Sequence, residues 1–119
     1  MKEVRKAIVS SLKAIHPHVS HMRVSNDAPF PYLVYTLEIT DAGDGLNMVT
    51  LDVEGWDNLD DTSRLEDLMG KVKNALNKSL VINDNLFLSI YLDRQFALTD
   101  DNPQLKRRMN IFMGRLYER

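Results

Sequence analysis

The stretch "YLVYTLEITDAGDGLNMVTLDVEGW", residues 32–56, constrains the fold more strongly than any other part of the chain. Apolar residues alternate with polar ones on both sides of its middle, which is the period of a strand that buries one face. The two alternating series are Leu33, Tyr35, Leu37 and Ile39, and then Val49, Leu51 and Val53. Between them, "DAGDG" consists of turn residues, with glycine available for positive φ. The stretch therefore predicts a β-hairpin with strands over residues 32–40 and 49–54, and with an acidic outer face on the second strand.

Two further segments have apolar residues at helical spacing. Residues 3–15 predict an amphipathic helix that the following proline ends, because a residue before proline avoids the helical region. A second helix opens in "DNLDDTSRLED", where Ser63 and Glu66 have the spacing of a capping box. The apolar stripe of this helix consists of Leu65, Leu68, Met69, Val72, Leu76 and Leu80. We expect Leu68 and Val72, at the centre of the stripe, to lie in the core.

Three shorter patterns complete the expected sheet. A short strand is expected at residues 22–24, and alternating residues predict strands over 86–92 and 109–117. The resulting order is α-β-β-β-α-β-β, in a single domain of residues 1–119. Strands joined by hairpins, with helices set apart in the sequence, are typical of the α+β class. We therefore expect an α+β fold with two helices packed on one face of a mostly antiparallel β-sheet of four to five strands.

Length and composition exclude several classes of protein. The 119 residues suffice for one domain with a core of its own. The absence of cysteine excludes disulfides, thiolate catalysis and cysteine-ligated zinc. The first residues carry charges throughout and no apolar run reaches the length of a membrane span, so we expect no signal peptide and no membrane segment. Fifteen basic residues against seventeen acidic ones give no overall attraction to nucleic acid, and we expect no direct nucleic-acid readout.

The charges are distributed unevenly along the chain. Residues 38–67 hold ten acidic residues opposed only by Arg64, whereas both ends of the chain are mostly basic. One interpretation is a set of solvated faces that neutralise one another in the folded chain. The other is a subunit with an acidic and a basic side, each of which meets a neighbouring copy. The candidate interface residues on this second interpretation are Asp57, Asp60 and Asp61 on the acidic side, and Arg107, Arg108 and Arg115 on the basic side.

Trp56, the single tryptophan, lies where the second hairpin strand leads toward the second helix. By strand alternation it shares a face with Asp52 and Glu54. Tryptophan is enriched at protein interfaces, which makes Trp56 a further candidate interface residue. The alternative is a tryptophan that covers the edge of the core.

Two groups of residues suggest metal chemistry. The segment "HPHVSH", residues 16–21, holds every histidine of the chain, and imidazole is a common ligand for zinc and copper. Pro17 interrupts the helix that would bring these rings together, so we interpret the histidines as a solvated loop and predict no metal and no cofactor. Asp52 and Glu54 share a strand face and could hold magnesium in a metal-dependent hydrolase, although the local sequence offers neither a base nor a phosphate-binding cation. Neither a G-x-S-x-G nor a G-x-x-x-x-G-K motif is present, and we predict no catalytic residue.

The order of these features resembles that of the small tail terminator, or tail-to-head joining, proteins of long-tailed bacteriophages and prophages. In that family a proline-rich approach leads into a strand like "P-Y-x-V-Y", and a strand ending like "D-V-x-x-W" precedes the second helix. The matching residues are Pro31, Tyr32, Val34 and Tyr35, and then Asp52, Val53 and Trp56. The resemblance extends over nearly the whole chain in short pieces.

The resemblance implies a non-enzymatic α+β subunit that assembles as a hexameric ring. Such a ring caps the tail tube and joins it to the head connector, so the implied partners are further copies of the chain, the tail tube protein and the head connector protein. The implied location is the tail or neck of a virion, assembled in the cytoplasm of the bacterial host. The alternatives are another neck or tail component, the metal-dependent hydrolase described above, and a monomeric adaptor.

Overall fold

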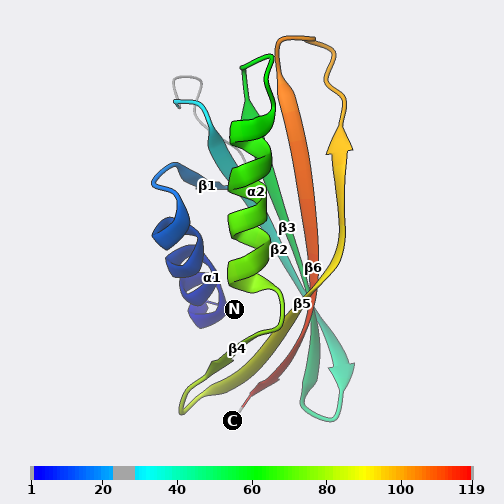
Figure 1. Ribbon diagram of the computed structural model, residues 1–119. Helices are drawn as coiled ribbons and strands as arrows, with labels where there is room; N and C mark the ends of the chain where they lie inside the picture. Colours follow the sequence, from blue (N-terminus) through cyan, green and yellow to red (C-terminus); the bar gives the residue numbers. More distant parts are fainter. Residues whose placement is uncertain (1, 23–28, 119) are drawn as a thin grey trace.

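The computed structural model describes residues 2–22 and 29–118, which form two helices and six strands (Figure 1). In chain order these are α1 (Lys2–Ile15), β1 (Val19–His21), β2 (Tyr32–Gly43), β3 (Leu46–Asp57), α2 (Ser63–Leu76), β4 (Ser79–Ile82), β5 (Leu86–Leu98) and β6 (Lys106–Glu118). The strands make one sheet in the order β1-β2-β3-β6-β5-β4. Strand β1 runs parallel to β2, and every other pairing is antiparallel.

The expectation of four to five strands with both helices on one face is wrong. The described residues form six strands, and the sheet curls into a half-barrel (Figure 1). Helix α2 contacts β3, β5 and β6, whereas α1 packs chiefly on α2 and on the edge strand β1. The curl has a physical cause: β2, β3, β5 and β6 are 12 to 13 residues long, and the twist between neighbouring strands accumulates over that length.

Both ends of α2 differ from the prediction. The helix ends at Leu76, and Lys78 then adopts a φ of 62°, which is incompatible with a continuing helix. Leu80, expected in the buried helical stripe, therefore lies in the additional strand β4 and is 60% exposed. At the other end, Ser63 is the first helical residue rather than the cap. Its backbone N–H and hydroxyl both donate to Oδ1 of Asp61, at 2.9 and 2.7 Å.

The strands near both loops also have other bounds than predicted. The short strand is Val19–His21 rather than residues 22–24, of which 23 and 24 lie outside the described residues. Strand β5 continues past the predicted end at residue 92 to Leu98, through a register shift between Leu92 and Arg94. A bulge of this kind lets a long strand bend without ending.

The predicted hairpin is confirmed. Strands β2 and β3 pair antiparallel from Tyr32 with Trp56 to Gly43 with Leu46. The two residues between the strands, Asp44 and Gly45, have φ values of 55° and 78°, as a type I′ turn requires. This turn suits the right-handed twist of the strands it joins, so the local sequence sets the register.

The core lies between α1, α2 and the concave side of the sheet. Leu68 and Val72 are 6% and 0% exposed, which confirms both as core residues. Phe112, at the middle of β6, is fully buried in the same hydrophobic cluster as the buried residues of both helices. The buried strand positions alternate along β3 as predicted, with Val49, Leu51 and Val53 inside. In the part of the chain that the structure describes, no helix is long and apolar enough to cross a membrane.

Candidate functional site

The sheet face that points away from the core is the candidate interaction surface. On β3, Leu51 and Val53 are buried, so the alternate residues Asp52, Glu54 and Trp56 belong to the opposite side. We call this side the outer face. The three residues were predicted to share one face, and the unbroken register of β3 with β2 and β6 at these positions confirms this.

One end of the outer face is apolar. Leu80 and Ile82 of β4 are 60% and 56% exposed, and Tyr91 and Tyr117 are 43% and 42% exposed. All four alternate with core positions; Val81, for example, pairs with buried Leu88. Exposed apolar side chains grouped in this way mark interaction sites more often than isolated ones do.

The other end of the outer face is built around Arg107. Its guanidinium lies 4.3 Å from the ring centroid of Trp56, and that ring stacks on Tyr32 at 6.0 Å. Arg107 also donates to Glu54 at 2.6 Å and forms an ion pair with Asp100 at 3.5 Å. Trp56 is therefore half-buried in a rigid stack on the outer face, and Arg107 is held by two carboxylates of its own chain.

Of the predicted acidic interface residues, Asp57 is buried, with 1% of its surface exposed. It accepts hydrogen bonds from Arg64 and from the backbone N–H of Asn58. Burial raises the pKa of the Asp57 carboxyl, but these hydrogen bonds and the charge of Arg64 outweigh burial and hold the pKa below its usual value. Asp57 thus anchors the connection from β3 to α2 within one chain.

The other predicted interface residues are more accessible. Asp60 and Asp61 are exposed, and hydrogen bonds from Ser63 lower the pKa of Asp61. Arg115 is exposed on the outer face, two residues before Tyr117. The structure does not bring the acidic group and the basic group together within one chain, and their meeting between neighbouring copies stays a prediction.

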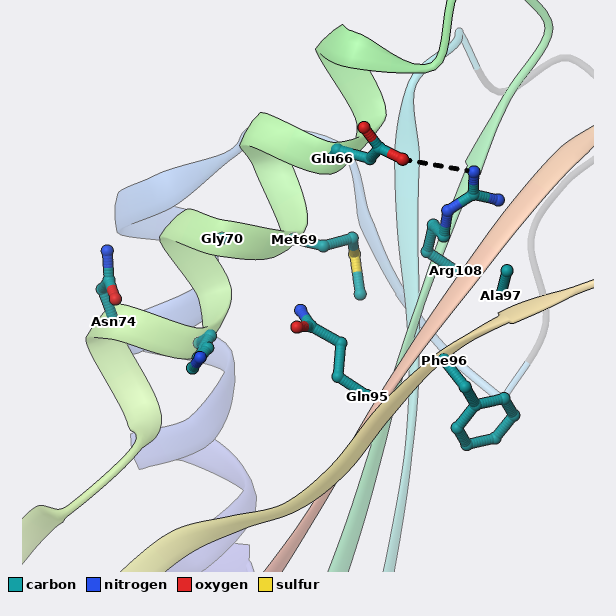
Figure 2. Close-up of a pocket in the computed structure, with 9 residues that line it drawn as sticks. Glu66, Met69, Gly70, Asn74, Gln95, Phe96, Ala97 and Arg108 are labelled. Carbon is teal, nitrogen blue, oxygen red and sulfur yellow. Dashed lines mark hydrogen bonds and ion pairs between the residues drawn. The ribbon is translucent and has the colours of Figure 1, made fainter.

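Arg108 lies on the core side of β6 beside a pocket of about 490 Å³ between α2 and the strands β5 and β6 (Figure 2). It forms an ion pair with Glu66 of α2 at 3.4 Å. The other lining residues are Met69, Gly70, Lys73, Asn74, Gln95, Phe96 and Ala97. No pattern along the chain predicts this pocket as a whole, because its two walls are some 20 residues or more apart in the sequence. One local signal was present: a glycine inside a helix, Gly70, is costly and usually has a packing reason.

The rings of His16 and His18 are in edge contact, with centroids 5.4 Å apart, but His16 and His21 each have a different partner elsewhere in the chain. The His16 ring nitrogen Nε2 lies 2.6 Å from the carbonyl oxygen of Pro31, whereas His21 stacks on Tyr35 at 4.8 Å. Among residues 2–22 and 29–118, no three histidine or carboxylate side chains are grouped so that they could hold a metal ion. The absence of a native metal stays a prediction.

Asp52 and Glu54 lie on one face, as the hydrolase alternative requires. Glu54 is engaged by Arg107, and burial raises the pKa of Asp52 despite the opposing charge of Arg94. Both effects reduce the availability of the two carboxylates as ligands for a hard cation, because one is already paired and the other resists ionisation.

Comparison with known proteins gives a match at the level of fold. No protein-family model and no curated protein matches the chain. Among solved structures, a chain of the "Virion of native gene transfer agent (GTA) particle" superposes with a TM-score of 0.73. The match covers 92% of this chain and 91% of the other, at 15% sequence identity. This similarity establishes a shared fold.

Proposed function

We propose that this protein is a structural subunit of a phage-like virion that assembles as a hexameric ring, caps the tail tube and joins it to the head connector. The observation that carries the proposal is the near-complete correspondence with a chain of a virion particle. Both chains are covered almost from end to end, so the likeness is to a whole subunit rather than to a common substructure. The finer role as a tail cap rests on the resemblance of the strand and helix order to the tail terminator family.

The chemistry of the outer face supports a binding role without catalysis. Of its carboxylates, Glu54 is engaged in an ion pair and Asp52 resists ionisation, and Trp56 is stacked on Tyr32. Rigid tryptophan, tyrosine and arginine side chains are the residues that contribute most at protein interfaces.

The shape and the surface chemistry also suit assembly. The molecule measures 47 × 23 × 22 Å, and its outer face offers exposed apolar side chains at one end and the Arg107 stack at the other. A stable interface needs about 800 Å² from each partner, which an elongated sheet face of these dimensions can supply. Apolar area provides the affinity, and the charged residues provide orientation.

Light scattering over a range of protein concentrations tests this proposal. The protein is measured by itself and with tail tubes polymerised from the tube protein of the same virion. We expect six-fold rings at tube ends in electron micrographs, and tubes that stop growing once capped. Ile82→Lys on the outer face should weaken assembly, and Leu59→Lys, an equally drastic change at a residue that is 43% exposed elsewhere, is the matched control. A protein that stays monomeric at every concentration and leaves tube growth unchanged would refute the proposal.

A further inference from the structure

The sheet has two edges that no described strand covers. Strand β1 pairs with β2 only from Leu33 to Tyr35, so residues 36–43 of β2 have no strand on the side away from β3 among the described residues. Strand β4 pairs with β5 only from Phe87 to Ile90, and the Asn77 side chain then accepts from the N–H of Leu92. Beyond that point, residues 93–98 have β6 as their one strand neighbour in the described chain. Unpaired edges of this length are templates for pairing with another chain.

The free edge of β5 borders the pocket beneath α2. Gln95, Phe96 and Ala97 line the strand side of the pocket. Figure 2 shows the Gln95 side chain directed toward the helix, whereas the Phe96 ring points away from it. A Cβ built on Gly70 would meet no atom within 4 Å, so the helix wall is recessed at its middle. An added strand therefore has room beside β5, with one row of its side chains directed into the pocket.

Charge distinguishes the two edges. Residues 24–63, which include the whole β2–β3 hairpin, contain no lysine or arginine, and the free part of β2 carries Glu38 and Asp41. Beside the β5 edge lie Arg94 and Arg108, which are ion-paired with Asp93 and Glu66, and Lys73 of the pocket, which supplies a further positive charge. Pairing β2 with β2 of another copy would place the acidic residues of β2 against one another, whereas pairing β2 with β5 places them near cations.

We propose that the free edge of β2 in one copy adds to the free edge of β5 in the next copy, beside the pocket under α2, so that the sheets of neighbouring subunits become continuous. This inference rests on the proposed ring. It identifies the surfaces that join its subunits. The contact is heterologous, because each copy offers one edge and receives the other, and such contacts produce a ring when the rotation closes. Main-chain hydrogen bonds supply the pairing, and the acidic side chains select β5 over a second β2.

Disulfide cross-linking tests this geometry directly, because the natural chain contains no cysteine. Thr36→Cys, Glu38→Cys and Thr40→Cys place a thiol on exposed positions of β2, at steps of two residues along one face. Each is mixed with Arg94→Cys, whose side chain is 68% exposed on β5, and the mixture is oxidised mildly. Lys13→Cys, on the exposed side of α1, replaces the β2 variant in the control.

We expect one of the three mixtures to give a disulfide-linked dimer in high yield, and the Lys13→Cys mixture to give none, because a disulfide needs Cα atoms about 4.4–6.8 Å apart. A chain carrying both cysteines of the productive pair should then form a covalent series that ends at the closed ring. If light scattering shows assembled rings but none of the three mixtures exceeds the control, the edge pairing is wrong and the ring stands. If the protein does not assemble at all, even with tail tubes, both proposals fall.

A charge reversal provides an independent measurement. Lys73→Glu, in the pocket, should raise the concentration of half-assembly by about three- to tenfold, because it places a like charge against the acidic edge of β2. Lys71→Glu makes the same change on the same helix outside this pocket and should leave assembly unchanged within about twofold. Equal effects of the two substitutions would contradict the placement of β2 beside this pocket.

Discussion

Replacing glycine by alanine at three positions should change the free energy of unfolding in three different ways. At Gly114, in the middle of β6, a Cβ would lie 2.8 Å from the backbone carbonyl oxygen of Ser89 on β5. Backbone cannot rotate out of the way, so the two strands must separate by several tenths of an ångström. Overpacking of this kind costs about 1–3 kcal/mol. The reduced freedom of the unfolded chain returns about 0.4–1 kcal/mol, and the net loss should be about 1–2 kcal/mol.

At Gly70 the same substitution should stabilise the protein. The position lies inside α2, and a Cβ there would meet nothing within 4 Å. Alanine is preferred over glycine inside a helix by about 0.5–1 kcal/mol, and no strain opposes this gain. At Gly55 the Cβ would meet Met69 Sδ at 2.6 Å and Leu65 Cδ1 at 2.9 Å, which are ends of flexible side chains. The change in the free energy of unfolding for Gly55→Ala should therefore lie between the loss at Gly114 and the gain at Gly70.

Urea unfolding measures the change in free energy of unfolding for all three variants. The protein concentration is kept low enough for the chain to stay monomeric, because assembly would add to the apparent stability. The slope of the free energy of unfolding against urea concentration should be the same for every variant. In thermal unfolding, the transition temperature of a variant should shift by about 3–5 °C for each kcal/mol of changed stability. A Gly114→Ala variant as stable as the natural chain, or a Gly70→Ala variant that loses more than about 0.5 kcal/mol, would show that the packing of β5 on β6 or of α2 has been misjudged.

Three further outcomes are expected. Leu68→Ala should lower the free energy of unfolding by about 2–5 kcal/mol in the same assay, and a loss below about 0.5 kcal/mol would contradict its place in the core. The lowered pKa of Asp57 means that its ion pair with Arg64 stabilises the fold fully above about pH 4 and loses this effect as the pH falls through the folded pKa. The stability difference between the natural chain and Asp57→Asn should accordingly shrink as the pH falls below about 4, and a constant difference would argue against the pair. Elemental analysis of protein purified without a histidine tag should find no stoichiometric zinc, copper or nickel; one equivalent retained through dialysis against a weak chelator would overturn the interpretation of the histidine cluster.

The sequence by itself determined the features that depend on neighbours along the chain. The hairpin of residues 32–56 follows from two alternating apolar series and a turn with glycine at a positive φ, and all of these lie within one local segment. The burial of Leu68 and Val72 follows from helical periodicity in the same way. These patterns suffice because strand alternation and helix turns repeat over two to four residues.

The tertiary structure decided the features that depend on distant residues. Leu80 continues the helical spacing, but the pairing of β4 with β5 and the positive φ of Lys78 place it in a strand. Arg107 meets Glu54, which is 53 residues away in the chain, because the sheet order puts β6 beside β3. The two free edges likewise exist because β4 covers only part of β5 and β1 covers only part of β2. The pocket exists because α2 lies across β5 and β6. Sheet order and curl arise from hydrogen bonds and twist summed over long strands, which no local pattern in the sequence encodes.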